Sequence, residues 1–186
     1  FTTYIYEIEG QTRCFTTYVP RNREEPLPIV IANNCYTNNE LGLCRGRSGL
    51  TRAADQYGFI GVCTTSADGN WTFGNDGVAN DANPTPCSAE DSKDILYMQG
   101  LFNTIDQLAA QGIADSERIF AGGFSQNSMF SAYIGICFHD RIRGIWQGGS
   151  GLYVRGETDP LPQMEGACRR SDFLEHGQRC REISPC

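Results

Sequence analysis

Residues 118–128 read Arg118-Ile-Phe-Ala-Gly-Gly-Phe-Ser125-Gln-Asn-Ser128. The apolar run at the beginning of this segment is typical of a buried strand, and the residues after Ser125 continue in a helical pattern as far as Phe138. A serine between a strand and a helix, flanked by small residues, is typical of a nucleophile elbow, the sharp turn that lifts a reactive hydroxyl above the edge of a sheet. The segment predicts that Ser125 is a catalytic nucleophile.

Short apolar runs and helical patterns alternate on both sides of this turn. We expect buried strands at Leu27–Ala32, Phe59–Cys63, Arg118–Ala121 and Ile142–Gln147, and helices at Ser48–Tyr57, Asp91–Gln111 and Gln126–Phe138. Ahead of them, Thr2–Glu9 and Arg13–Val19 alternate apolar with polar residues and predict an antiparallel hairpin that turns at Gly10-Gln11. The order predicts an α/β fold with a mostly parallel sheet and helices on both faces.

The segments between these elements are rich in Asn, Gly, Asp and Pro. Residues 33–46 and 67–86 are therefore expected to be loops. The periodicity fades after Gly151, so we divide the single domain into a core of residues 1–151 and a cysteine-rich loop segment of residues 152–186.

Composition excludes several classes of protein. The 186 residues are 40% hydrophobic and 20% charged, with a net charge of −7, which suits one globular domain with a core. Nucleic acids and anionic membrane surfaces attract basic patches, so the acidic balance argues against both as partners. No apolar run approaches the roughly 20 residues that cross a membrane.

The nine cysteines indicate disulfides and an oxidising, extracellular compartment. They are Cys14, Cys35, Cys44, Cys63, Cys87, Cys137, Cys168, Cys180 and Cys186. None belongs to a CxxC pair, so no metal site is expected. Because nine is odd, at least one thiol is free or joined to a second, disulfide-linked chain. The sequon at Asn70 predicts glycosylation of a surface loop, and Phe1 is expected to begin a processed, secreted chain.

Backbone amides near Ser125 are candidates for an oxyanion hole. The N–H of Gln126 follows the serine at the N-terminus of a helix, where it would face the same point as the hydroxyl. A second donor is expected in the loop after the first core strand, at Asn33 or Asn34. This chemistry requires neither a metal nor a cofactor.

Seven segments together resemble one family of enzymes. They are Tyr18-Val19-Pro20, Pro26–Ile31, Gly58-Phe59-Ile60, Asp91–Asp94, Ile113–Ile119, Gly123-Phe124-Ser125 and Asp140–Gly144. In this order they are similar to secreted α/β-hydrolases of the polyhydroxybutyrate depolymerase and feruloyl esterase type, over residues 13–151. The resemblance implies a serine esterase in which Ser125 forms an acyl-enzyme with an ester substrate and the Gln126 amide binds the oxyanion.

The chain departs from the family pattern at three places. Asn33-Asn34 stands where the family has His-Gly, and Asn127 replaces the last glycine of the elbow. The side chain of Asn127 is expected to crowd the contact between helix and strand. The third departure is that no strand-like run follows Gly151, although an α/β-hydrolase has two further strands there. We therefore expect that the C-terminal part of the fold lies outside these residues.

The general base and the acid of a catalytic triad have few candidates in the chain. His139 comes directly after the elbow helix, a position typical of a cation at a helix C-terminus. His176 follows Ser125 in the order Ser, Asp, His, with Asp172 or Asp159 before it, although two side chains four residues apart are also typical of a solvated turn. Without a base a serine hydroxyl is a weak nucleophile.

Other candidate residues have two readings. Asp94 stands near the start of its helix, where Ser88–Asp91 resembles a capping box, and is expected to interact with the helix dipole or tether a loop rather than act as an acid. Trp71 and Phe73 either line an ester pocket or pack on their own domain.

Two functional hypotheses follow. One is a secreted serine esterase whose base and acid come from beyond residues 1–186. The other is a catalytically inactive, hydrolase-like structural or binding module of an extracellular assembly.

Overall fold

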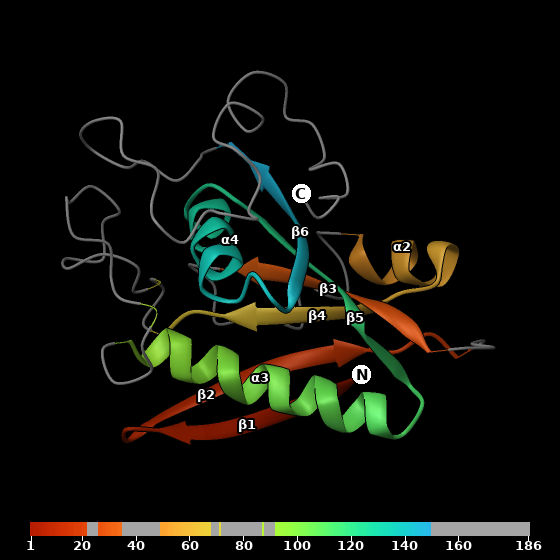
Figure 1. The fold of residues 1–186 in the computed structure, drawn as a ribbon, viewed down its shortest axis with the longest axis horizontal. Coiled ribbons are helices and arrows are strands. Elements are labelled where there is room, and N and C mark those ends of the chain that lie inside the picture. The colour runs from red at the N-terminus through yellow and green to blue at the C-terminus, as the bar shows by residue number, and fades with distance from the viewer. Residues whose placement is uncertain (22–25, 35–48, 68–70, 72–86, 88–91, 150–186) are drawn as a thin grey trace.

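The computed structural model describes residues 1–21, 26–34, 49–67, 71, 87 and 92–149 (Figure 1). Several predictions from the sequence lie outside these described residues. They concern Asn70, Phe73, Ser88–Asp91, Asp159, Asp172, His176, the segment 152–186 and Cys35, Cys44, Cys168, Cys180 and Cys186.

The described residues form a six-stranded mixed sheet with three helices. In chain order the elements are β1 (Thr2–Ile8), β2 (Gln11–Tyr18), β3 (Leu27–Asn34), α2 (Leu50–Tyr57), β4 (Ile60–Thr65), α3 (Lys93–Ala110), β5 (Ala114–Phe124), α4 (Gln126–Cys137) and β6 (Ile142–Gly148). The strand order is β1-β2-β4-β3-β5-β6. The β1–β2 and β2–β4 pairs are antiparallel, whereas β3–β4, β3–β5 and β5–β6 are parallel. The predicted α/β class with an N-terminal hairpin is confirmed.

The hairpin turn lies one residue earlier than the sequence indicated. Ile8 pairs with Gln11, so Gln11 belongs to β2 and the turn consists of Glu9 and Gly10. Their φ angles are 49° and 77°. Two central residues with positive φ match the twist of a two-residue hairpin, which explains the glycine.

Other expectations about the elements also need correction. Helix α3 begins at Lys93 rather than Asp91, because Ser92 is its N-cap and accepts a hydrogen bond from the Ile95 amide at 3.3 Å. Helix α2 begins at Leu50 rather than Ser48 and buries only Leu50 and Ala54, so that its last residue, Tyr57, is 71% exposed.

Strand β3 is longer than predicted and extends to Asn34, so Asn33 and Asn34 belong to the strand rather than to a loop. They pair with Thr64 and Thr65 of β4, which continues the parallel ladder past the apolar run.

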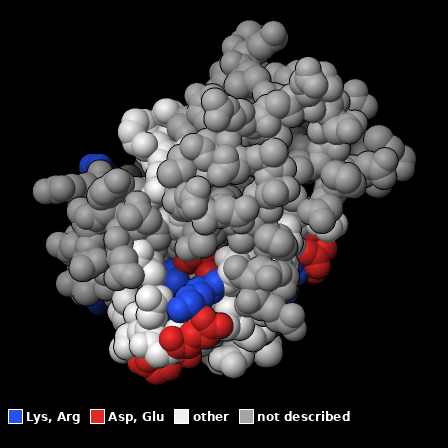
Figure 2. Space-filling view, turned by 90° about the vertical axis from the view of Figure 1, so that its left-hand side faces the viewer, with Lys and Arg blue, Asp and Glu red and all other residues white. Residues whose placement is uncertain are grey.

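Charged side chains of opposite sign lie close together on the described surface. Figure 2 shows basic side chains beside acidic ones on one face of the molecule. One such pair joins the hairpin turn to the start of α3, where Lys93 Nζ lies 3.3 Å from the Glu9 carboxylate. None of the described helices combines the length and the apolar character that a membrane crossing requires.

Disulfides are present, as the cysteine content predicted. Cys87 is bonded to Cys137 at the end of α4, which ties the segment before α3 to the elbow helix. Cys63 on β4 is also disulfide-bonded.

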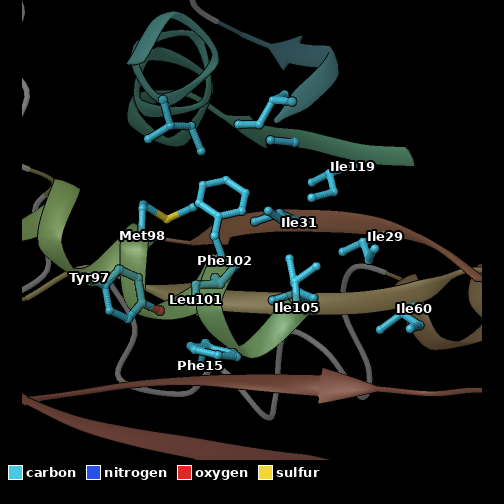
Figure 3. Close-up of a cluster of buried hydrophobic side chains, with 14 of the residues drawn as sticks. Phe15, Ile29, Ile31, Ile60, Tyr97, Met98, Leu101, Phe102, Ile105 and Ile119 are labelled. Atoms are coloured by element: carbon cyan, nitrogen blue, oxygen red, sulfur yellow. The ribbon is translucent and has the colours of Figure 1, made fainter. Parts of the chain in front are cut away.

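Alternating side chains of the central strand β3 separate the two faces of the sheet. Ile29 and Ile31 belong to the main core, which also contains side chains of α3 and α4 (Figure 3). Val30 and Ala32 pack instead on the smaller cluster around Leu50 of α2. Helices therefore cover both faces, as predicted, and α4 runs from the carboxyl end of β5 into the core.

Candidate active site

Ser125 occupies the turn between β5 and α4. Its φ of 58° and ψ of −127° lie outside the regions that ordinary residues occupy, and its side chain is exposed. Among the described residues other than glycine, only Ser125 and Glu9 have a positive φ. Such a conformation costs about 1–3 kcal/mol and persists where its surroundings impose it. The sharp strand-to-helix turn that the sequence predicted is therefore present.

Hydrogen bonds from both sides hold the backbone of Ser125. Its N–H donates to the carbonyl oxygen of Gly148 on β6 at 2.7 Å. Its carbonyl oxygen accepts from the Ser128 amide at 2.9 Å and from Ser128 Oγ at 2.6 Å. The carbonyl oxygen of Ser128 in turn accepts from Gln147 Nε2 at 2.9 Å. Strand β6 and the first turn of α4 together impose the strained conformation.

Two glycines make room for the turn. A Cβ on Gly123 would lie 2.4 Å from Asn127 Cβ, and a Cβ on Gly122 would lie 2.8 Å from the Trp146 ring. The crowding expected from Asn127 is therefore relieved by Gly123, which has no side chain. Asn127 itself belongs to α4 and has no positive φ.

The predicted oxyanion donors occupy different environments. Gln126 is the first residue of α4, and backbone amides of a first helical turn point away from the helix toward its N-terminus. The side chain of Asn33 is instead buried between the sheet and α4. Its Nδ2 donates to Ser131 Oγ at 2.8 Å, and its Oδ1 accepts from Thr64 Oγ1 at 2.8 Å.

The carboxyl end of β3 lies beside that of β5, because Ala32 pairs with Gly122. The backbone of Asn33 and Asn34 thus ends at the same edge of the sheet as the elbow. Their role as oxyanion donors stays a prediction. The side chain of Asn33 is hydrogen-bonded to Ser131 and Thr64 instead.

Among the described residues His139 is the one histidine, and it lies at the opposite end of α4 from Ser125. Its Nδ1 is 3.2 Å from the carbonyl oxygen of Ile136 in the last turn of the helix. The 12 residues of α4, at 1.5 Å each, separate the two ends by roughly 18 Å. His139 interacts with a helix C-terminus, as its position in the sequence suggested, and is too distant to act as the base.

Asp94 is a structural tether. Its carboxylate lies 2.7 Å from Arg13 Nη2, and both side chains are buried, so the pair joins α3 to β2. The Arg13 guanidinium also stands 4.4 Å from the centre of the Tyr97 ring. Burial raises the pKa of Tyr97, so the phenol stays protonated and donates to the Cys14 carbonyl oxygen at 2.9 Å.

Trp71 packs inside the domain and does not line an open pocket. It is fully buried, and its ring stacks on Phe130 with 3.8 Å between centroids. Its Nε1 donates to Asn127 Oδ1 at 2.9 Å. This bond could not be predicted from the sequence, because no periodicity of the residues around Trp71 indicates what it contacts.

Within the described ranges no group of His, Cys, Asp and Glu side chains is arranged to hold a metal ion. What the geometry offers chemically is an exposed hydroxyl beside the N-terminus of a helix.

No protein-family model matches the sequence, and the search of curated proteins gave no match. Solved structures are similar in fold. An acetyl xylan esterase from Aspergillus awamori matches with a TM-score of 0.56 and 18% identity, over 77% of this chain and 50% of that one. An S-formylglutathione hydrolase from Agrobacterium tumefaciens matches with a TM-score of 0.53 and 18% identity, over 78% of this chain and 56% of that one.

A fluorophosphonate-binding serine hydrolase from Staphylococcus aureus, FphF, matches with a TM-score of 0.53 and 13% identity, over 77% of this chain and 54% of that one. The chain therefore spans about half the length of the solved structures it resembles. The likeness shows an α/β-hydrolase fold.

Proposed function

We propose that the chain belongs to a secreted serine hydrolase that cleaves carboxylic esters through an acyl-enzyme on Ser125. The observation that carries the proposal is the exposed, strained serine between β5 and α4, held by Gly148 and Ser128. The similar structures, named as an acetyl xylan esterase, an S-formylglutathione hydrolase and a serine hydrolase, support it at the level of the fold.

The geometry suits a two-step acyl transfer. Ser125 Oγ attacks the carbonyl carbon of the ester while a general base takes the hydroxyl proton. The oxyanion that forms accepts a hydrogen bond from the Gln126 amide. The C–O bond to the alcohol then breaks, the base returns the proton to the departing alkoxide, and water hydrolyses the acyl-enzyme by the same path.

The base and the acid of this mechanism come, in our proposal, from beyond residues 1–186. His139 lies at the far end of α4, and the Asp94 carboxylate is bound to Arg13. A second chain joined through the odd cysteine would be one source. Within the sequence His176, with Asp172 or Asp159, is the remaining candidate pair.

A fluorophosphonate probe on native, disulfide-bonded protein tests the proposal. We expect the probe to modify Ser125, and Ser125→Ala to abolish both labelling and ester hydrolysis. Ser116→Ala is the matched control, because Ser116 lies on the same strand away from the elbow and should leave labelling unchanged. Wild-type protein that is folded but not labelled would contradict a catalytic Ser125.

The second candidate is an inactive structural or binding module. The position of His139 favours it, since no described histidine can serve Ser125. In that case no ester is turned over, and Ser125→Ala leaves assembly and binding unchanged.

A further inference from the structure

Trp71 contacts the elbow helix at two places one turn apart. Its ring stacks on Phe130 with an interplanar angle of 6°, and its Nε1–H donates to Asn127 Oδ1 at 2.9 Å. Both Trp71 and Asn127 are buried, so water does not compete for this hydrogen bond. The two residues are 56 positions apart in the sequence.

Asn127 also lies close to β5. The hypothetical Cβ of Gly123 would lie 2.4 Å from Asn127 Cβ, so the strand and the helix are in close contact there. The carbonyl oxygen of Asn127 accepts from Ser131 Oγ at 2.7 Å. The first turn of α4 therefore contacts both β5 and Trp71.

We propose that Trp71 is a positioning residue that acts through Asn127 on the Gln126 amide. Gln126 directly precedes Asn127, so a rotation of the first turn of α4 moves the Gln126 N–H. An oxyanion donor works when it lies 2.7–3.1 Å from the developing charge, and small displacements weaken it. This inference rests on the proposed function of Ser125, but its structural part concerns the amide alone.

The test compares two substitutions in the same buried cluster. Trp71→Phe removes the N–H donor and keeps an aromatic ring against Phe130. Tyr97→Phe is the matched control: it also removes one donor from a buried aromatic ring, but that donor bonds to the Cys14 carbonyl oxygen on β2. Both variants lose a hydrogen-bond donor on an aromatic side chain, and only the donor of Trp71 is bonded to the elbow helix.

The first readout is the NMR order parameter of the Gln126 amide, which does not depend on activity. We expect a rigid value of about 0.85 in wild type and Tyr97→Phe, and a fall toward about 0.6 in Trp71→Phe. Asn127→Ala should lower the order parameter by a similar amount. The double variant Trp71→Phe/Asn127→Ala should lower it little further, because both substitutions break the hydrogen bond between Trp71 and Asn127. An unchanged order parameter in Trp71→Phe overturns the inference.

The second readout is phosphonylation of Ser125. We expect the maximal labelling rate of Trp71→Phe to fall about tenfold with little change in half-saturation, below the 10²–10³-fold loss that follows removal of an oxyanion donor. Labelling at the wild-type rate would overturn the catalytic part of the inference. Absent labelling of the wild type, together with a fall in the order parameter, would overturn the proposed function and leave the positioning of the amide standing.

Discussion

Gly123 lies against the first turn of α4, one residue before the end of β5. In Gly123→Ala the new Cβ would meet Asn127 Cβ at 2.4 Å, so strand or helix must move. We expect a loss of about 1–3 kcal/mol in the free energy of unfolding, as for other overpacked sites, together with loss of Ser125 labelling. Urea denaturation and the fluorophosphonate probe measure the two effects.

Gly100, in the middle of α3, provides the control. A Cβ there would meet Tyr6 Cε1 at 3.5 Å, an ordinary contact. Alanine favours helix by about 0.5–1 kcal/mol over glycine, so Gly100→Ala should stabilise the protein by that amount. If Gly123→Ala and Gly100→Ala changed the free energy of unfolding equally, the contact with Asn127 would not explain why position 123 requires a glycine.

Individual residues of the site could be predicted only where the signal was local. The strand, the glycines and the helix around Ser125 follow one another in the sequence, so one short segment was enough to predict the elbow. The contacts of Trp71 and Asn33 depend on how distant elements meet at α4, which no pattern within either segment encodes.

The buried pair of Arg13 and Asp94 is one of the contacts that link β2 to α3. Replacing one member of a buried ion pair leaves the other charge uncompensated, so Asp94→Asn should cost about 3–5 kcal/mol in the free energy of unfolding. The double variant Arg13→Met/Asp94→Leu should recover most of this loss, because it buries no charge. Equilibrium unfolding in urea measures both variants.

An exposed pair tests whether burial is the cause. Arg143 Nη2 lies 2.5 Å from Glu117 on the β5–β6 surface, and both side chains are largely exposed. Glu117→Gln should cost less than about 1 kcal/mol, as is typical of exposed pairs. A cost for Asp94→Asn no larger than that would refute the importance of the buried pair.

Strands and helices could be predicted from the sequence where apolar runs were continuous. The residues at which these elements begin and end could not. Strand β5 begins at Ala114, well before the predicted Arg118. The residues after Ala114 at the start of β5 are polar, and their side chains interact with one another. Arg118 donates to the Asp115 carboxylate at 2.5 Å and holds the pKa of that carboxyl below its usual value. The strand order could not be predicted from local patterns either, because β3 pairs with β4 and β5 rather than with β2, the strand before it in the sequence.

The covalent state of the whole molecule distinguishes the two functional hypotheses. A polypeptide of residues 1–186 has a mass of 20.6 kDa. If a disulfide-linked second chain supplies the base and acid, the native mass should exceed this value and should fall on reduction, because reduction cleaves the bond that joins the two chains. Intact mass spectrometry with and without reductant measures this. A single mass that equals residues 1–186 plus any glycan would contradict a disulfide-linked partner.

The central position of β3 has a consequence for the order of events during synthesis. Its partner β5 ends at residue 124, 90 residues after the end of β3 at residue 34. At about 5–20 residues per second, the ribosome needs roughly 5–20 seconds to make that stretch. One edge of β3 is unpaired throughout, and open strand edges invite association with other chains. The strand that closes this edge also leads into the turn at Ser125, so that turn cannot form before the centre of the sheet is complete.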